Sequence, residues 1–235
     1  MQVPNENVVS QTIKSTQLKI NQLARILPIR TELHLFRKIW HMMTGLAIIS
    51  VYMSGVSQAT ILSFLIPFFF WTVAMEVWRL KNPLINEKCI RFFSVIIRSN
   101  EVHRVSGVPY YIASSIVAVG IFPKPVAILS LFYLALGDPL ASLFGILFSN
   151  RSVKIFNGSK SLHGTAAGYC VCAIVTWLYL RSTGMHGLDL IRLTLLGGFA
   201  GALAELLPLD IDDNFTIPVV SGFILWLGFI AVHFV

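Results

Sequence analysis

Long runs of apolar residues constrain this chain more than any other feature. Seven runs of roughly 17 to 25 residues, each long enough to cross about 30 Å of hydrocarbon as an α-helix, alternate with shorter polar segments. They cover residues 39–55, 59–80, 105–122, 125–148, 162–180, 188–208 and 215–235. Only 12% of the residues are charged, about half the share of a soluble domain. We therefore predict an all-α, polytopic membrane bundle with about seven transmembrane helices.

The first 38 residues differ from the rest because they are polar to amphipathic. They lack the apolar core of a cleavable secretory signal, so we expect residues 1–38 to form a cytosolic N-terminal arm. Its apolar residues mix with arginine and lysine, which is typical of an interfacial helix, here broken at Pro28. A disordered tail is the alternative interpretation. Residues 39–235 would form a membrane-embedded domain.

Lysine and arginine mark one side of the predicted bundle. Of the 18 such residues, all but Lys124, Arg181 and Arg192 lie in the arm or in the loops after the second and fourth runs. Positive charge concentrates on the cytosolic side of membrane proteins. We therefore expect the N-terminus and these loops in the cytosol and the C-terminus outside. The net charge of +7 then calls for no nucleic-acid partner.

Acidic residues gather at the same end of the predicted helices. Those that share this location are Glu76, Glu101, Asp138, Glu205, Asp210, Asp212 and Asp213. Asp138 lies about 20 Å along its run from the outer end, at 1.5 Å per residue. Ionisable residues within a membrane segment are costly and usually face a functional cavity. We therefore predict a single site on the cytosolic face.

The sequence Gly137-Asp138-Pro139 interrupts the fourth apolar run. Proline disrupts the preceding helical turn and frees backbone carbonyls, which can direct Asp138 into a cavity. Gly137, Ala141 and Gly145 recur every fourth residue and predict a close helix contact. A buried carboxylate favours a divalent cation such as Mg²⁺. A hydrogen bond from Asp138 to a neighbouring helix is the alternative.

A polar, glycine-bearing turn at residues 157–165 leads into the fifth run. Backbone N–H groups, hydroxyls and a lysine at a helix N-terminus suit a phosphate group. The candidate phosphate ligands here are Gly158, Ser159, Lys160, Ser161, Gly164 and Thr165. The spacing is not that of a Walker A motif. A helix cap at Ser161 or Thr165 and an ordinary cytosolic charge at Lys160 are the alternatives.

Acids also crowd the turn between the sixth and seventh runs, from Glu205 to Asp213. They run against the basic trend of the other cytosolic loops, which indicates a bound cation. We therefore expect Asp212 and Asp213 to join Asp138 as metal ligands. The alternative is that Asp213 or Asn214 caps the seventh helix.

Basic groups complete the predicted pocket. The candidate phosphate ligands before the first and third runs are Arg37, Lys38 and Arg104. His41 is a candidate general base, although an interfacial histidine is also often just hydrogen-bonded. Glu76 lies one turn from Arg79, so an ion pair is its alternative role. Acidic residues that can bind a metal ion and basic residues that can bind phosphate, in one pocket, suit phosphoryl or nucleotidyl transfer.

These motifs, in this order along the chain, resemble the CTP-dependent lipid kinases, which include dolichol kinase, phytol kinase and the fungal type of diacylglycerol kinase. The matching residues are Arg37-Lys38 with His41, Glu76 with Arg79, Arg104 with Gly107 and Tyr110, Gly137-Asp138 with Ala141 and Gly145, Lys160-Ser161 with Gly164-Thr165, and Glu205 with Asp212-Asp213-Asn214 and Pro218. The resemblance covers nearly all of the chain beyond the arm.

The resemblance implies transfer of the γ-phosphate of CTP to the hydroxyl of a membrane lipid alcohol, either diacylglycerol or a polyprenol, dolichol or phytol type of isoprenoid. We expect residues 39–235 to be the catalytic domain and Mg²⁺ to be the cofactor. The expected catalytic residues are Asp138, Lys160, Glu205, His41 and Glu76, with Gly137 and Asn214 added to the phosphate ligands.

Two alternatives remain from the sequence. Phosphatidate cytidylyltransferases share the Gly-Asp and Lys-Ser-x-x-Gly-Thr elements, but this chain lacks their usual basic-acidic C-terminal signature. An anion or lipid transporter would place polar residues near the midplane with access from both sides. The polar residues of this chain lie toward one side.

Overall fold

The computed structural model describes residues 6–27, 35–148, 153–155 and 160–233, and these residues are predominantly helical. The helices in chain order are α1 (Glu6–Ile26), α2 (Leu35–Met53), α3 (Gln58–Lys81), α4 (Pro83–Phe92), the 3-10 turn η1 (Ser99–Glu101), α5 (Gly107–Ile121), α6 (Lys124–Phe132), the π-helix η2 (Tyr133–Gly137), α7 (Asp138–Leu147), α8 (Leu162–Ser182), α9 (Gly187–Leu206) and α10 (Asp213–Ala231). Two short antiparallel strands, β1 (Lys154–Ile155) and β2 (Lys160–Ser161), precede α8.

Each predicted apolar run coincides with a helix, so the prediction of an all-α membrane bundle is confirmed. Within the described residues, five helical segments are long and apolar enough to span a membrane: α3, the continuous rod from α6 through η2 to α7, α8, α9 and α10. The apolar helix α5 is shorter, and α2 carries two basic residues in its first turn. The count of seven spans stays a prediction.

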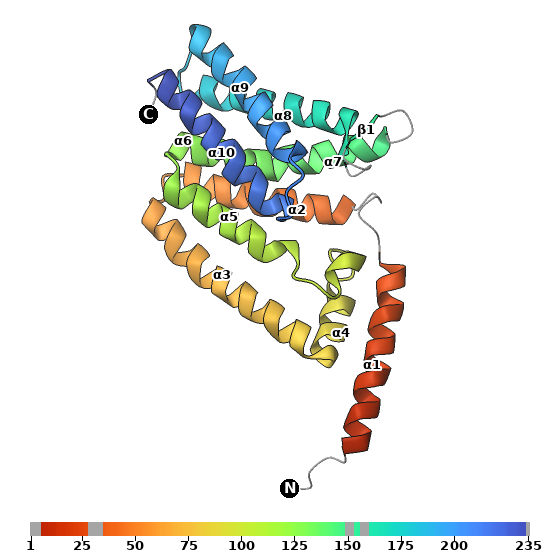
Figure 1. Ribbon diagram of the computed structural model, residues 1–235. Helices are drawn as coiled ribbons and strands as arrows, with labels where there is room; N and C mark the ends of the chain where they lie inside the picture. Colours follow the sequence, from red (N-terminus) through yellow and green to blue (C-terminus); the bar gives the residue numbers. More distant parts are fainter. Residues whose placement is uncertain (1–5, 28–34, 149–152, 156–159, 234–235) are drawn as a thin grey trace.

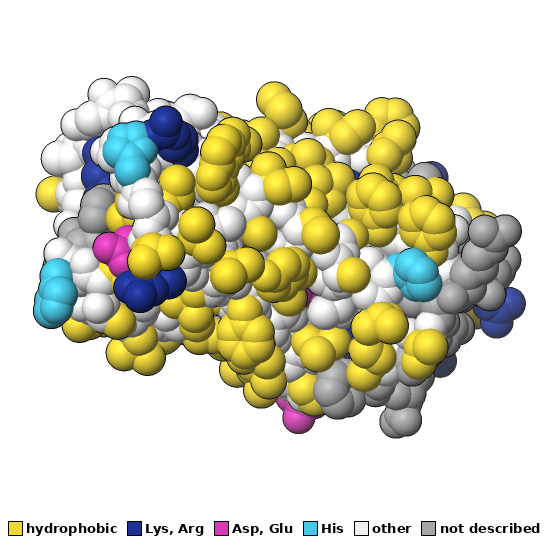
Figure 2. All heavy atoms as spheres, turned by 90° about the horizontal axis from the view of Figure 1, so that it is seen from above, with side chains coloured by type: hydrophobic (Ala, Val, Ile, Leu, Met, Phe, Trp, Pro, Cys, Tyr) yellow, Lys and Arg dark blue, Asp and Glu magenta, His cyan; other side chains and the backbone are white. Residues whose placement is uncertain are grey.

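The helices pack side by side, with α8 between α7 and α9, and α10 between α9 and α5 (Figure 1). Their outer surface carries exposed Phe, Trp, Leu and Ile side chains, for example Phe64, Trp71 and Leu195. In Figure 2 hydrophobic side chains form a broad band across the middle of the molecule, while most charged and histidine side chains lie toward its two ends. This distribution is that of a bundle surrounded by lipid.

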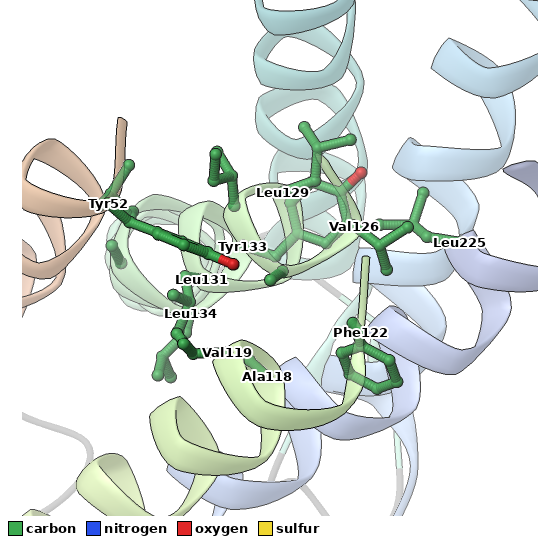
Figure 3. Packing of buried hydrophobic residues seen from close by; sticks show 14 of the residues in the cluster. Tyr52, Ala118, Val119, Phe122, Val126, Leu129, Leu131, Tyr133, Leu134 and Leu225 are labelled. Atoms are coloured by element: carbon green, nitrogen blue, oxygen red, sulfur yellow. The ribbon is translucent and has the colours of Figure 1, made fainter. Parts of the chain in front are cut away.

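The rod formed by α6, η2 and α7 lies in the interior of the bundle. Val126 through Leu131 are all buried, as expected of a helix that is apolar on every side. Figure 3 shows Val126, Leu129 and Tyr133 packed toward neighbouring helices, with Phe122 and Leu225 nearby. The buried part of the rod, α6 and η2, therefore supports α7, which begins at Asp138.

A second, smaller hydrophobic cluster joins α1 to α4 and the segment after α4. Its buried members are Ile20, Leu27, Ile90, Ile97 and Val102. The predicted helix in the N-terminal arm is present as α1, and it runs away from the main bundle toward the N-terminus (Figure 1). Pro28, the predicted break, lies outside the described residues. α1 thus packs against the segment that carries η1.

Candidate active site

A cavity of about 880 Å³ opens at the end of the bundle where α2, α7, α8 and α10 bring their charged termini together. This volume lies within the range of about 300 to 1,000 Å³ that small-molecule sites occupy. The predicted site residues that line it are Arg37, Lys38, His41, Arg104, Asp138, Lys160, Ser161, Gly164, Glu205, Asp212, Asp213 and Asn214. Glu76, Gly137 and Thr165 lie outside this wall, and Gly158 and Ser159 fall outside the described residues.

A π-turn places Asp138 and His41 on the cavity wall. The N–H of Asp138 donates to the carbonyl of Tyr133, five residues back, and Pro139 has no N–H to donate. The carbonyl of Leu134 therefore lacks a helical partner, and Nε2 of His41 lies 2.9 Å from it. Since a carbonyl only accepts, Nε2 must carry the proton, and Nδ1 is the ring nitrogen left to accept one. π-turns within α-helices occur frequently at functional sites.

The carboxylate of Asp138 lies among both basic and acidic side chains. It interacts electrostatically with Lys38, His41 and Lys160 and also with Glu205 and Asp212. Among the described residues none forms a hydrogen bond or ion pair with it, and the amine of Lys38 donates instead to Ser142 Oγ at 2.6 Å. Asp138 is therefore available to a ligand in the cavity.

Lys160 is held between two acids. Its amine lies 3.1 Å from Glu205 Oε1 and 3.1 Å from Asp213 Oδ2. Burial alone would lower the pKa of Lys160, but Asp213, Glu205 and Asp138 outweigh it, so the pKa is raised above its ordinary value. Thr165 Oγ1 lies 3.4 Å from the other oxygen of Glu205. Lys160 is thus a cation held in place in the cavity wall, and the Thr165 hydroxyl contacts Glu205, one of its two partners.

The predicted small-residue stripe on α7 is a contact with α8. A Cβ added at Gly164 would lie 2.8 Å from the Ala141 carbonyl oxygen, and one at Gly137 would lie 2.8 Å from Cys172 Sγ. Ser161 caps α8 by accepting from the N–H of Gly164 at 3.1 Å. The glycines Gly137 and Gly164 therefore permit close approach of the two helices, and Ser161 fills the capping role that the sequence left as an alternative.

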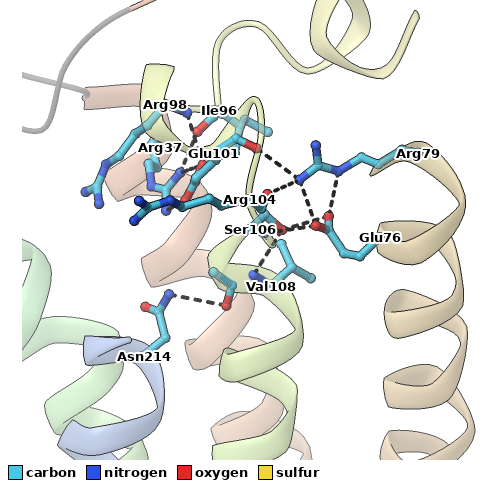
Figure 4. A network of polar contacts seen from close by, with 11 residues as sticks. Arg37, Glu76, Arg79, Ile96, Arg98, Glu101, Arg104, Ser106, Val108 and Asn214 are labelled. Carbon is cyan, nitrogen blue, oxygen red and sulfur yellow. Dashed lines mark hydrogen bonds and ion pairs between the residues drawn. The ribbon is translucent and has the colours of Figure 1, made fainter. Parts of the chain in front are cut away.

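Glu76 and Arg79 fasten the loop before α5 to the end of α3. The Arg79 guanidinium donates to both oxygens of Glu76, at 3.0 and 2.7 Å, and to the carbonyls of Glu101 and Arg104, at 3.1 and 2.7 Å. Glu76 in turn accepts from the N–H and the hydroxyl of Ser106. Figure 4 shows Arg79 and Glu76 on one helix reaching across to this loop. The ion pair that the sequence offered as the alternative for Glu76 is present.

Arg37 and Glu101 connect the same loop to α2. Two nitrogens of Arg37 lie 2.7 and 2.8 Å from the two Glu101 oxygens, and one also donates to the Ile96 carbonyl. Burial would raise the pKa of Glu101, but the hydrogen bonds from Arg37 and the Arg98 N–H lower it below its ordinary value. The sequence placed Glu101 at this end of the bundle but did not identify Arg37 as its partner.

Arg104 is one of the basic residues that this loop contributes to the cavity, together with Arg98. It is exposed, and among the residues described here its guanidinium has no hydrogen-bond or ion-pair partner. Its backbone carbonyl, by contrast, is fixed by Arg79. The side chain can therefore bind an anion without breaking an existing ion pair.

Asp212 is the N-cap of α10, because its Oδ1 accepts from the N–H of Asn214 at 2.9 Å. The cap is thus Asp212 rather than the Asp213 or Asn214 of the alternative interpretation. Burial raises the pKa of Asp212 above its ordinary value. Asn214 donates from Nδ2 to the Gly107 carbonyl at 3.2 Å. Its amide therefore ties α10 to α5.

The described residues contain no group of three or more His, Cys, Asp or Glu side chains placed to hold a metal ion by themselves. Asp213 pairs with Lys160, and Asp212 caps α10. The prediction that Asp138, Asp212 and Asp213 together form one metal site thus gains no support from the geometry, although all three line the same cavity.

Fold and cavity together define a polytopic helical membrane protein with a charged, ligand-sized site at one end of its bundle. Comparison with known proteins is consistent with this class. The CTP-dependent diacylglycerol kinase 1 of Saccharomyces cerevisiae is 31% identical over 204 residues, which cover 79% of this chain and 70% of that protein. The protein of the same name from Eremothecium gossypii is 32% identical over 79% of this chain and 64% of its own length, and that from Schizosaccharomyces pombe is 29% identical over 65% and 73%.

This chain belongs to the CTP-dependent lipid kinase family. The family resemblance inferred from the motifs is thereby confirmed. No family model and no solved structure matches the chain.

Proposed function

We propose that this chain is a membrane kinase that transfers the γ-phosphate of CTP to the hydroxyl of diacylglycerol. The relatives are named for both substrates, and no relative named for a polyprenol, dolichol or phytol is among them. The observation that carries the proposal is the Asp138 carboxylate, which faces the cavity among Lys38, His41 and Lys160 with no direct partner among the described residues. The products would be CDP and phosphatidic acid.

Positive groups on three sides of the cavity would bind the triphosphate. Lys38 lies on α2, Lys160 on β2 and Arg104 on the loop before α5. Phosphoryl transfer needs mainly positioning and neutralisation of the charge on the transferred group. Lys160, which is held in place by two acids, is suited to positioning the phosphates, and Arg104, whose side chain is available, is suited to neutralising their charge.

Mg²⁺ fits this site only together with a nucleotide. Mg²⁺ usually binds through one or two carboxylates plus substrate phosphates and water, rather than in an all-protein cage. Asp138 supplies one such carboxylate, and Asp212 at the rim has its Oδ2 not used by the cap. When bound, the ion would neutralise phosphate charge and orient the phosphates.

His41 is the group we assign to accept the proton of the lipid hydroxyl. Its Nε2–H is directed at the Leu134 carbonyl, which leaves Nδ1 with the lone pair. As the hydroxyl oxygen bonds to the γ-phosphorus, the bond from that phosphorus to the β–γ bridging oxygen breaks and the proton passes to Nδ1. The edge-on contact with Tyr111, with ring centroids 4.7 Å apart, fixes the imidazole plane.

We further propose that the cavity faces the cytosol, with the N-terminus on the same side and the C-terminus outside. The distribution of lysine and arginine along the sequence supports this orientation. CTP would then enter from the water, while the hydroxyl of diacylglycerol is presented at the same membrane interface.

The test offers CTP labelled at the γ-phosphate to purified protein in mixed micelles with diacylglycerol. Label should enter phosphatidic acid, and Asp138→Asn should lower kcat by at least about a hundredfold, because mutation of a group that stabilises transition-state charge typically costs this much. Asp189→Asn is the matched control, since Asp189 pairs with Arg192 on an exposed surface at the opposite end of the bundle.

Three outcomes would overturn the proposal. Full activity of Asp138→Asn would remove Asp138 from the mechanism. Release of pyrophosphate with cytidylyl transfer to lipid would instead indicate nucleotidyl transfer. No labelled lipid from any lipid alcohol would leave transport as the alternative.

A further inference from the structure

Among the described residues that line this largely polar cavity, three are exposed, branched and apolar. They are Val105 before α5 and Leu209 and Ile211 in the turn between α9 and α10, with exposed fractions of 42%, 48% and 50%. Leu209 and Ile211 alternate with Asp210 and Asp212. Phosphate binding and catalysis explain the charged residues of the wall. They do not explain why Leu and Ile side chains are exposed to solvent beside those residues.

The two segments that carry these residues are held against each other. The Asn214 amide, just after the turn, donates to the carbonyl of Gly107, two residues beyond Val105. Ser114 Oγ on α5 also donates to the Asn214 carbonyl, at 2.7 Å. Val105, Leu209 and Ile211 therefore belong to one edge of the cavity, which we call the apolar rim.

The apolar rim adjoins the outer surface of the bundle at the start of α5. Val108, in the first turn of α5 and three residues beyond Val105, is also exposed. The same cavity is lined by the charged residues Lys38, Asp138 and Lys160. A molecule that binds here therefore meets charged groups as well as the exposed hydrocarbon of the apolar rim.

From this arrangement we propose that the apolar rim is the binding site for the acyl chains of the lipid substrate where they leave the cavity for the bilayer. This inference rests on the proposed diacylglycerol kinase function and adds the residues that select for acyl chains. A diacylglycerol has a single free hydroxyl next to two hydrocarbon chains. The rim would let the hydroxyl reach the Asp138 side while the chains remain covered by Val105, Leu209 and Ile211.

The test compares a long-chain and a short-chain diacylglycerol, dioleoylglycerol and dihexanoylglycerol, with Leu209→Gln and Ile211→Gln. Loss of one branched side chain from a hydrocarbon contact should raise KM for dioleoylglycerol about tenfold. KM for CTP and for dihexanoylglycerol should change less than about twofold, because CTP does not bind at the rim and the six-carbon chains make little contact with it. Leu188→Gln, at an exposed apolar position in the first turn of α9, is the control and should leave all three KM values unchanged.

A second measurement needs no activity. A diacylglycerol with a photoreactive diazirine on one acyl chain should crosslink to the peptide that contains residues 207–214, and excess dioleoylglycerol should compete. Equal effects of the variants on both chain lengths, a selective rise of KM for CTP, or crosslinks only elsewhere would each overturn the inference. If wild-type protein phosphorylates neither lipid, the kinase proposal itself fails, and that result is distinct from a rim without chain-length preference.

Discussion

The contact of Arg79 with the loop before α5 leads to a prediction that separates positioning from chemistry. The guanidinium is 4% exposed and serves four groups: Glu76, the Asn86 amide oxygen, and the carbonyls of Glu101 and Arg104. Lysine in its place keeps the charge but has one nitrogen with three donors instead of a rigid fork with five. Arg79→Lys therefore cannot satisfy all of these acceptors at once.

The cost follows from what is left unsatisfied. A hydrogen bond that involves a charged group contributes about 1.5 to 3 kcal/mol. If one or two such bonds are lost, the free energy that holds the loop closed falls by about 1.5 to 6 kcal/mol, depending on how far the loop relaxes. Since the same loop carries Arg104 into the cavity, KM for CTP should rise at least about tenfold, which corresponds to about 1.4 kcal/mol. We expect kcat at saturating CTP to change little, because the groups around Asp138 are unaffected.

The assay is steady-state kinetics with varied CTP, together with thermal unfolding in detergent. Arg91→Lys is the matched control, because Arg91 also forms an ion pair but is 59% exposed and contacts Glu87 on its own helix, a type of pair that contributes about 0.3 to 0.5 kcal/mol. If Arg79→Lys and Arg91→Lys give the same KM, or if kcat alone falls, Arg79 does not position the nucleotide site.

Two further predictions concern packing and pH. Gly164→Ala should lower the free energy of unfolding by about 1 to 3 kcal/mol, as overpacking does, because its new Cβ would meet the Ala141 carbonyl at 2.8 Å. Gly120→Ala, with its nearest neighbour at 3.8 Å, should not, and equal melting temperatures of the two variants would refute the close contact. Glu101 has its pKa below the ordinary 4.5 in the folded protein, so its stabilisation is present above that pH and is lost as the pH falls. Glu101→Gln should thus be clearly less stable than wild type at pH 7 but nearly equal at the acid end of the range. A gap that stays constant with pH would contradict this.

The location of the site was predictable because a bilayer leaves few places for charge. Every charged residue that appears within an apolar run must face a cavity or a partner, so the sequence alone could place Asp138 and Glu205 at one end, and the polar turn before the fifth run placed Lys160 at the same end. The structure brings these three to the same cavity. Hydropathy likewise located the helices, since backbone groups within lipid must be satisfied inside the helix.

The roles of individual residues were less predictable, because they depend on partners distant in sequence. Glu76 was expected to be catalytic, yet its oxygens are occupied by Arg79 and by Ser106, 30 positions away. Gly164 was interpreted as part of a phosphate cradle. A glycine that admits a phosphate and one that admits a neighbouring helix look the same in a single sequence.

The π-turn explains how the chain fixes two reactive groups with one backbone feature. Pro139 removes a donor, and the register shift to Tyr133 leaves the Leu134 carbonyl open. An unsatisfied carbonyl in a membrane interior is costly, and His41 removes that cost by donating Nε2–H to it. The same turn that exposes the Asp138 carboxylate therefore also selects the tautomer of His41 and its place on the wall. Asp138 and His41 are thus held in register through the backbone of η2 without a direct hydrogen bond between them, so each remains available to substrate.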